Sequence, residues 1–225
     1  MIFRTRQISG FKKEGRRAAK IVVLVDGEPW ATLDPETVVR ERLRTGEGLD
    51  AARQSQILAT DETIRARKAA AGHGARSPKT RHELERFLRE RRFAESAIQA
   101  ALAMLEASGT LDDERAAEWL IRSRRRRRDV GPRRLEADLR TQGFTPAEAG
   151  ERLGEALAGV DWVAECLALA RKTARRYEPL AETAQRRKLA AALARRGYAL
   201  DVVWQAIRRL MAERGGTADE NEAEE

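Results

Sequence analysis

The residues of this chain with the clearest chemical potential are arginines. Eight of them fall within 13 positions and are opposed by a single acid, Asp129. The eight are Arg122, Arg124, Arg125, Arg126, Arg127, Arg128, Arg133 and Arg134. Five consecutive positions cover more than one turn of a helix, so the five charges cannot share one solvated face. Because the planar guanidinium group binds phosphate or carboxylate through paired hydrogen bonds, this arginine run predicts a surface for an anionic partner.

Further basic clusters indicate the same chemistry. One lies near the N-terminus and consists of Lys12, Lys13, Arg16 and Arg17. Others lie in the last third of the chain and consist of Arg171, Lys172, Arg175 and Arg176, then Arg186, Arg187 and Lys188. The formal net charge of the chain is +8. These features favour a polyanion or an acidic protein surface as the partner.

Side chains suited to catalysis or metal binding are scarce. His73 is predicted in a flexible loop and His82 at an exposed helix start, which is too few ligands for a metal site. The acids Asp112-Asp113-Glu114 precede an apolar helix and are predicted to cap it. Cys166 is surrounded by apolar helix residues and is predicted to fill the core. We therefore expect no enzymatic activity, no metal and no cofactor.

A repeated block must position these charges. A 24-residue segment occurs three times without gaps, beginning at His82, Arg133 and Arg187. The aligned apolar positions are Leu84/Leu135/Leu189, Leu88/Leu139/Leu193, Phe93/Phe144/Tyr198 and Leu102/Leu153/Ile207. Offsets of 51 and 54 residues suit three short helices per repeat. Such repeats bury their apolar faces against neighbours and leave long surfaces exposed, which favours binding a large partner.

The end of one helix in each repeat is marked by the residue before the aromatic position. Gly143 and Gly197 suit the left-handed backbone that commonly ends a helix. Arg92 takes this place in the first copy, where we expect either strain or a different turn. The tryptophans in phase with apolar neighbours, and therefore predicted in the core, are Trp119, Trp162 and Trp204.

The N-terminal part has a different pattern. Residues 1–17 are basic and predicted to be irregular. Asp26-Gly27 lies between two apolar runs and predicts a β-hairpin with a type I′ turn. Asp34-Pro35 predicts a helix start, and a second helix is predicted to open at Asp50 and run toward Ala71.

The predicted fold class is mainly α, with tandem three-helix repeats in an elongated curved array behind a small N-terminal β-hairpin and helix unit. The predicted domains are the N-terminal unit (1–60), three repeats (61–108, 109–159 and 160–213) and a disordered acidic tail (214–225). A single cysteine excludes an internal disulfide, and no apolar run reaches the roughly 18 residues of a membrane span. A signal peptide is not evident. We expect a cytoplasmic protein.

The segment from Gly109 to Arg124, with Gly131-Pro132-Arg133-Arg134-Leu135 and Gly143-Phe144, resembles the bacterial RecX family of recombination regulators. The third copy, with Arg187-Lys188-Leu189 and Gly197-Tyr198, extends the likeness, as does the hairpin at Asp26-Gly27-Glu28. The resemblance implies a protein that binds RecA filaments on DNA and depresses ATP hydrolysis and strand exchange during recombination, DNA repair and the SOS response. It implies no catalytic residues. We also expect the protein to be a monomer. The alternative is a sequence-independent DNA-binding protein without a recombinase partner.

Overall fold

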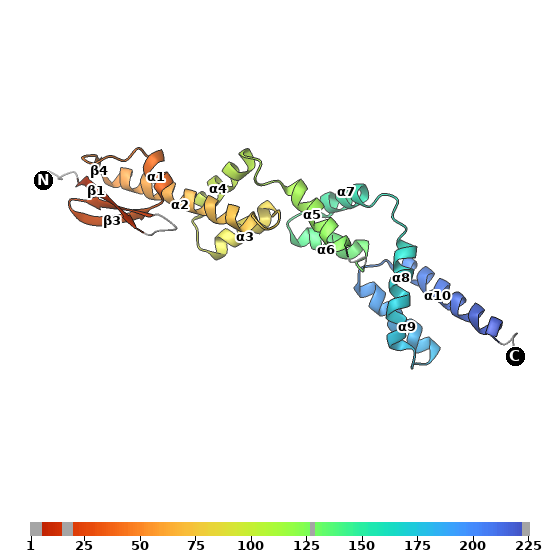
Figure 1. Cartoon of the computed structure of the whole chain (residues 1–225). Coiled ribbons are helices and arrows are strands. Elements are labelled where there is room, and N and C mark those ends of the chain that lie inside the picture. Colours follow the sequence, from red (N-terminus) through yellow and green to blue (C-terminus); the bar gives the residue numbers. More distant parts are fainter. Residues whose placement is uncertain (1–5, 15–19, 127–128, 222–225) are drawn as a thin grey trace. The chain divides into compact units, whose positions relative to one another are not determined.

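The computed structural model describes residues 6–14, 20–126 and 129–221, with side chains up to Arg214. The chain forms two compact units, Met1–Asp113 and Glu114–Glu225. The fold is mainly helical with a small sheet near the N-terminus, as predicted (Figure 1). The strands are β1 (Arg6–Glu14), β2 (Lys20–Val25), β3 (Glu28–Leu33) and β4 (Gly48–Leu49). The helices are α1 (Pro35–Arg40), α2 (Ala51–Gly74), α3 (Arg81–Glu90), α4 (Glu95–Ala107), α5 (Asp113–Arg125), α6 (Pro132–Thr141), α7 (Pro146–Ala156), α8 (Trp162–Ala174), the 3₁₀ turn η1 (Arg175–Tyr177), α9 (Glu182–Arg195) and α10 (Leu200–Asn221).

The described strands form a four-stranded antiparallel sheet in the order β3-β2-β1-β4. Asp26 and Gly27 have φ values of 53° and 90°, so the predicted hairpin turn with two positive φ angles is confirmed. The expectation of irregular structure before the hairpin is wrong for β1. Its polar sequence carries little strand signal, and it is held by pairing with β2 and by burial of Ile8 in the sheet core.

One long helix serves two cores. The N-cap of α2 is Asp50, whose side chain accepts a hydrogen bond from the backbone nitrogen of Arg53 at 2.7 Å, as the sequence predicts. Ile57 packs in the core of the sheet, whereas Ala66 and Ala70 pack in the core that α3 and α4 complete. The helix continues to Gly74, and the ring of His73 stacks on Phe87 with centroids 3.9 Å apart. The prediction that His73 lies in a flexible loop is therefore wrong.

Three further cores follow the predicted repeats. They centre on Leu84 and Leu88, on Leu135 and Leu139, and on Leu189 and Leu193. All of the aligned apolar positions are buried except Phe93, which is half-buried. The repeat register read from the sequence is confirmed.

The turns between helices repeat the same backbone geometry. Arg92, Gly143 and Gly197 have φ values of 61°, 99° and 90°. In each copy the next residue donates to the carbonyl five positions earlier, and the left-handed residue donates to the carbonyl three positions earlier. This is the double hydrogen bond of the Schellman motif. Arg92 thus adopts the left-handed conformation that its glycine counterparts adopt without a Cβ penalty, and the expected strain lies there.

Two glycines join the second and third repeats inside the C-terminal unit. The backbone nitrogen of Gly131 donates to the carbonyl of Arg196 at 2.8 Å, and that of Arg133 donates to Gly197 at 3.0 Å. A Cβ on either glycine would overlap the backbone of the opposite segment. Gly131 is the N-cap of α6 and has no side chain to accept a hydrogen bond from the first turn of the helix. The carbonyl of Gly197, in the turn after α9, accepts the hydrogen bond from the backbone nitrogen of Arg133 instead.

The C-terminal helix extends further than expected. α10 buries Val203, Ile207 and Leu210 and continues to Asn221, across most of the segment for which the sequence predicts disorder. Its later turns include Gly215, Gly216 and Thr217, which have low helix propensity, so the local sequence does not explain why the helix continues beyond the last core contact. Residues 222–225 lie outside the described residues.

Candidate partner-binding surface

The predicted arginine run occupies the last turn of α5, the residues after it and the first turn of α6. Ala117 and Ile121 face the core, which leaves the remaining faces of α5 to polar side chains. Arg122 is exposed and lies 3.7 Å from Glu118, and Arg126 is exposed without a described partner. Arg127 and Arg128 lie outside the described residues. Arg133 is exposed on α6.

Arg125 differs from the rest of the run because it points inward. Its two terminal nitrogens donate to both oxygens of Glu165 at 2.8 Å, and its guanidinium lies 5.0 Å from the centre of the Trp162 ring. Its side chain is only 20% exposed. Glu165 and Trp162 therefore already satisfy the charge of Arg125 and cover its plane, and the place of Arg125 in the binding surface stays a prediction.

Arg124 and Arg134 share one carboxylate. Their Nε atoms lie 3.0 and 3.2 Å from the two oxygens of Asp138, whose side chain is mostly buried. Both guanidinium groups remain more than half exposed. Since a guanidinium carries five N–H donors, the outer donors of both residues can still reach a ligand.

The basic cluster of the third repeat lies on α8, η1 and α9. Arg171 is paired with Glu213 through hydrogen bonds of 3.0 and 2.6 Å, and Arg186 is paired with Glu182. The remaining basic residues are exposed and have no ion pair within the described part of the chain: Lys172, Arg175, Arg176, Arg187 and Lys188. This cluster therefore holds unneutralised positive charge.

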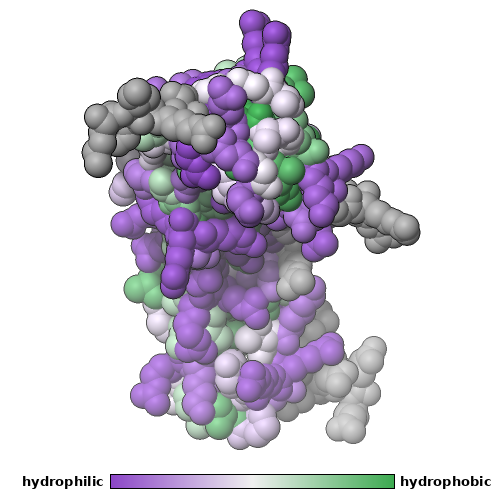
Figure 2. Space-filling model, turned by 90° about the vertical axis from the view of Figure 1, so that its left-hand side faces the viewer, coloured by the Kyte–Doolittle hydropathy of each residue, from purple (hydrophilic) through white to green (hydrophobic). Residues whose placement is uncertain are grey.

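The N-terminal cluster lies in the other unit. Lys12 and Lys13 are exposed on β1, and Arg16 and Arg17 lie outside the described residues. Figure 2 shows one side of the molecule, where hydrophilic residues predominate and hydrophobic ones form small separate patches.

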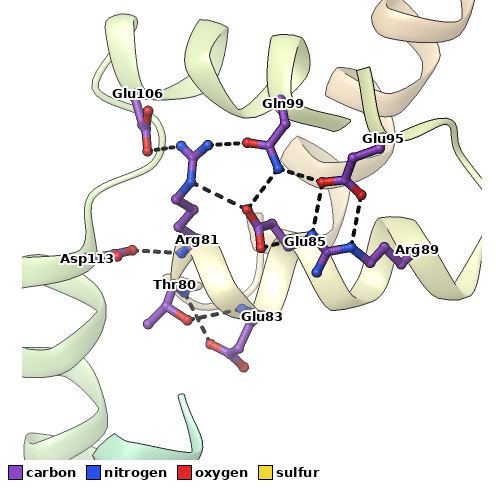
Figure 3. A network of polar contacts seen from close by, with 9 residues as sticks. All are labelled: Thr80, Arg81, Glu83, Glu85, Arg89, Glu95, Gln99, Glu106 and Asp113. Atoms are coloured by element: carbon purple, nitrogen blue, oxygen red, sulfur yellow. Dashed lines mark hydrogen bonds and ion pairs between the residues drawn. The ribbon is translucent and has the colours of Figure 1, made fainter. Parts of the chain in front are cut away.

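Two arginines of the first repeat, Arg81 and Arg89, are neutralised by carboxylates within that repeat. Arg81 bonds Glu106 and donates to Gln99 at 2.6 Å, and Arg89 donates to both oxygens of Glu95 (Figure 3). The hydrogen bonds from Arg89 and from Gln99 lower the pKa of Glu95 to about 2. These contacts join α3 to α4 and serve the fold, so arginine content alone does not identify a binding surface.

The side chains that could take part in catalysis or metal binding have structural roles instead. Cys166 is fully buried, as predicted, and burial raises the pKa of its thiol to about 11, which disfavours the reactive thiolate. Asp113 accepts a hydrogen bond of 2.7 Å from the backbone nitrogen of Arg81, so it caps the start of α3 as well as opening α5 (Figure 3). Among the described residues, no three side chains of His, Cys, Asp or Glu gather where they could hold a metal ion.

Two of the three tryptophans are not in the core. The side chain of Trp119 is 40% exposed and that of Trp204 is 45% exposed, so the prediction of burial is wrong for both. Trp204 directly follows the buried Val203, whereas Trp119 lies two positions after the buried Ala117 and two before the buried Ile121, so neither is in phase with the buried stripe of its helix. Trp162 is partly buried and packs against the cores of both the second and the third repeats.

Two of the three repeats match models of a known protein family. Residues 112–151 match the family model described as the second three-helix domain of RecX, and residues 161–207 match the third. Among the described residues, no helix combines the length and the hydropathy needed to cross a bilayer.

Relatives and solved structures agree with these matches. The chain is 31% identical over 132 residues to the regulatory protein RecX of Pelodictyon phaeoclathratiforme, covering 59% of this chain and 80% of the relative. It is 40% identical to that of Mycolicibacterium vanbaalenii, covering 56% and 73%. A crystal structure of regulatory protein RecX covers 88% of this chain and 96% of its own, with a TM-score of 0.69 and 21% identity, and so shares the fold. From the repeats, the fold and these identities, we conclude that the chain belongs to the RecX family.

Proposed function

We propose that this protein regulates homologous recombination by binding RecA filaments on DNA and lowering their ATP hydrolysis and strand exchange. The observation that carries the proposal is the 31% identity across 80% of a regulatory protein RecX. Helical repeats with exposed arginines suit such a role, because each repeat offers an exposed charged surface for a large partner. We propose that the protein acts in the cytoplasm and as a monomer.

We propose that the partner contacts the exposed arginines at the start of α6 and the end of α5, with the lysines and arginines of the third repeat as a second contact. The first group contains Arg122, Arg124, Arg126, Arg127, Arg128, Arg133 and Arg134. The second contains Arg171, Lys172, Arg175 and Arg176, and the N-terminal group contains Lys12, Lys13, Arg16 and Arg17. Exposed guanidinium groups can bind either carboxylates of the recombinase or phosphates of the DNA.

The proposed domain division also remains part of this hypothesis. We propose one N-terminal unit (1–60), three repeats (61–108, 109–159 and 160–213) and an acidic tail (214–225). Each repeat would then carry its own core and add one segment of binding surface. The first boundary would fall inside α2, which is shared by two cores.

ATP hydrolysis by the recombinase on single-stranded DNA tests the function directly. We expect the rate to fall when this protein is added at a substoichiometric dose. An unchanged rate at stoichiometric dose would contradict the proposal. Double replacement of Arg126 and Arg133 by Gln should weaken the inhibition, while replacement of Arg208 and Arg209, which removes the same charge from exposed positions of α10, should not.

Binding measurements separate this function from that of a plain DNA-binding protein. A regulator of filaments should bind the recombinase–DNA complex more tightly than bare DNA or free recombinase. A phosphate-binding protein engaging roughly five phosphates should instead bind bare duplex with a log K against log salt slope near −4 to −5. Equal competition by bare DNA and filaments would favour the second function.

A further inference from the structure

The third repeat contains a pocket between α8, η1 and α9, which lie together in the C-terminal unit (Figure 1). Its volume is about 250 Å³. The residues that define this basic pocket are the apolar Leu169 and Leu193, the aromatic Tyr177, and Arg176, Arg195 and Arg196. Three arginines and a set of apolar and aromatic side chains therefore line the same pocket.

The charges of the basic pocket are only partly neutralised. Within the described residues, its lining contains no carboxylate. Arg196 reaches Asp129 at 2.5 Å, whereas Arg176 and Arg195 are exposed and make no ion pair within the described part of the chain. By contrast, Arg81 and Arg89 of the first repeat are each held by carboxylates, which are Glu106, Glu85 and Glu95 (Figure 3). Like charges repel unless an anion lies between them, so the basic pocket is suited to an anion.

Neighbouring cations extend the positive field along both helices. Lys172, on α8, lies four positions before Arg176, on η1. On α9, Lys188 lies seven positions, or two turns, before Arg195. Both lysines are exposed. A row of positive charge leading into a pocket is the arrangement that follows the backbone of a single nucleic-acid strand.

The apolar and aromatic lining limits the kind of anion. The Asp and Glu side chains of an acidic peptide offer carboxylates but carry no ring of their own to lie against Tyr177 and Leu169. A nucleotide offers a phosphate for the arginines and a base or sugar for the apolar side. The volume lies below the 300–1,000 Å³ of most sites for drug-sized ligands, so it suits one such group. In a duplex the bases are paired and stacked, and only a single strand can present one.

We propose that the basic pocket binds one nucleotide of single-stranded nucleic acid. The phosphate lies between Arg176, Arg195 and Arg196, and the base or sugar packs against Tyr177. This inference goes beyond the proposed function because it requires no recombinase. It also gives the protein its own contact with DNA.

Fluorescence anisotropy with labelled oligothymidylate tests the proposal on the full chain without recombinase. A strand of about 16 nucleotides covers the range of typical single-strand sites. Double replacement Arg176→Gln and Arg195→Gln should weaken binding about tenfold, as expected for the loss of a charge-assisted contact. It should also reduce the salt slope by about 0.7, the value for one phosphate on a single strand.

Two sets of controls distinguish an effect of the pocket from an effect of net charge and from unfolding of the variants. Arg208→Gln with Arg209→Gln removes the same charge from α10 and should leave most of the affinity. Tyr177→Leu should weaken binding at least about fivefold with the salt slope unchanged, and Tyr177→Phe should restore it, because the ring stacks on the base. Unchanged melting temperatures for the arginine variants establish that they are folded.

Competition experiments identify the ligand class. Unlabelled single strand should displace the probe, whereas a duplex of equal length and a polyglutamate of equal charge should do so poorly. Equal displacement by polyglutamate would show an acidic protein surface as the ligand, and equal displacement by duplex would show that only phosphate is bound; either overturns the proposal. Equal loss in the pocket and α10 variants also overturns it. Failure here would leave inhibition of recombinase unaffected, so the two proposals are tested separately.

Discussion

Arg125 and Arg126 are neighbours of the same type, yet only Arg125 has internal partners. We expect Arg125→Ser to lower the free energy of unfolding by about 1.5–3 kcal/mol, the range for hydrogen bonds to charged groups. The paired hydrogen bonds to Glu165 and the contact with Trp162 would both be lost. Arg126→Ser should change it by less than about 0.5 kcal/mol, as for most exposed positions. Urea denaturation of the two variants measures the difference.

A double-mutant cycle assigns the effect to the pair. Glu165→Ala should be destabilising alone and should add little in the Arg125→Ser background, because the second change removes an interaction already lost. Fully additive effects would mean that the carboxylate does not hold Arg125.

Tyr198 carries a hydroxyl that its surroundings do not satisfy. The residue is 1% exposed, and within the described residues its hydroxyl has no hydrogen-bond partner. The aligned residues of the other repeats are Phe93 and Phe144, which lack the hydroxyl. We expect Tyr198→Phe to raise the free energy of unfolding by about 1 kcal/mol, since an unsatisfied buried group costs about 1–3 kcal/mol. Thermal and urea denaturation measure it, and a clear loss of stability would reveal a partner for the hydroxyl.

Residue type alone could not distinguish Arg125 from the rest of the arginine run. Composition predicts an anion-binding surface because five adjacent arginines exceed what one helix end requires. The internal partner, Glu165, lies 40 positions away in the next repeat, and only the packed structure brings it near. The burial of Cys166 could be predicted, because it depends on the local apolar helix pattern.

Between elements, the closest contact joins the turn after α9 to the start of α6. Gly197→Ala would strain a backbone at φ +90° and place a Cβ against the backbone of Arg134. Gly159→Ala strains a similar backbone at φ +77° but meets open space. We expect the first variant to be less stable than the second by about 1–3 kcal/mol, the usual cost of overpacking. Equal melting temperatures would show that the repeats do not meet through Gly197.

The pattern of elements was predictable where it depends on local spacing. The leucine alignment, the left-handed turn residues and the caps Asp34 and Asp50 all occur as expected, because each depends on contacts within a few positions. β1 and the last turn of α2, which continues to Gly74, were not predictable in this way. The strand depends on pairing with β2, and the glycines at 72 and 74 are tolerated in α2 because neighbouring turns are packed on two cores.

At the scale of the whole molecule, stability depends on carboxylates in both units that are more acidic in the folded state. The hydrogen bond from Arg89 holds the pKa of Glu95 at about 2, and that from Arg171 lowers the pKa of Glu213. The backbone nitrogen of Thr145 lowers the pKa of Glu148. Burial opposes the shift at Asp34, but its hydrogen bond with Lys68 prevails and lowers the pKa. Lowered carboxylate pKa values stabilise the fold above about pH 4.3 and lose that effect as the pH falls toward 2.

Protonation of His73 also lowers the stability of the fold on acidification, and it does so at a higher pH than protonation of the carboxylates. Burial against Phe87, together with nearby Lys79, lowers its pKa below the usual 6.5. The unfolded chain therefore binds this proton more readily, and acid below about pH 6.5 favours unfolding. Replacement His73→Phe keeps an aromatic ring on Phe87 and removes the titration, so it should abolish the decline that begins near pH 6.5 while leaving the steeper decline below about pH 4.3.

We therefore expect the melting temperature to be level from about pH 7 to 9 and to fall in two steps on acidification. The second step should be larger, because 36 Asp and Glu residues lose their charge while 44 Lys and Arg residues keep theirs. The growing positive charge then repels itself throughout the chain. Added salt should restore part of the loss by screening that repulsion, but not the part due to broken carboxylate hydrogen bonds. Thermal denaturation at several pH values and two salt concentrations measures both parts, and stability that stays constant down to about pH 3 would contradict the folded-state pKa shifts of the carboxylates.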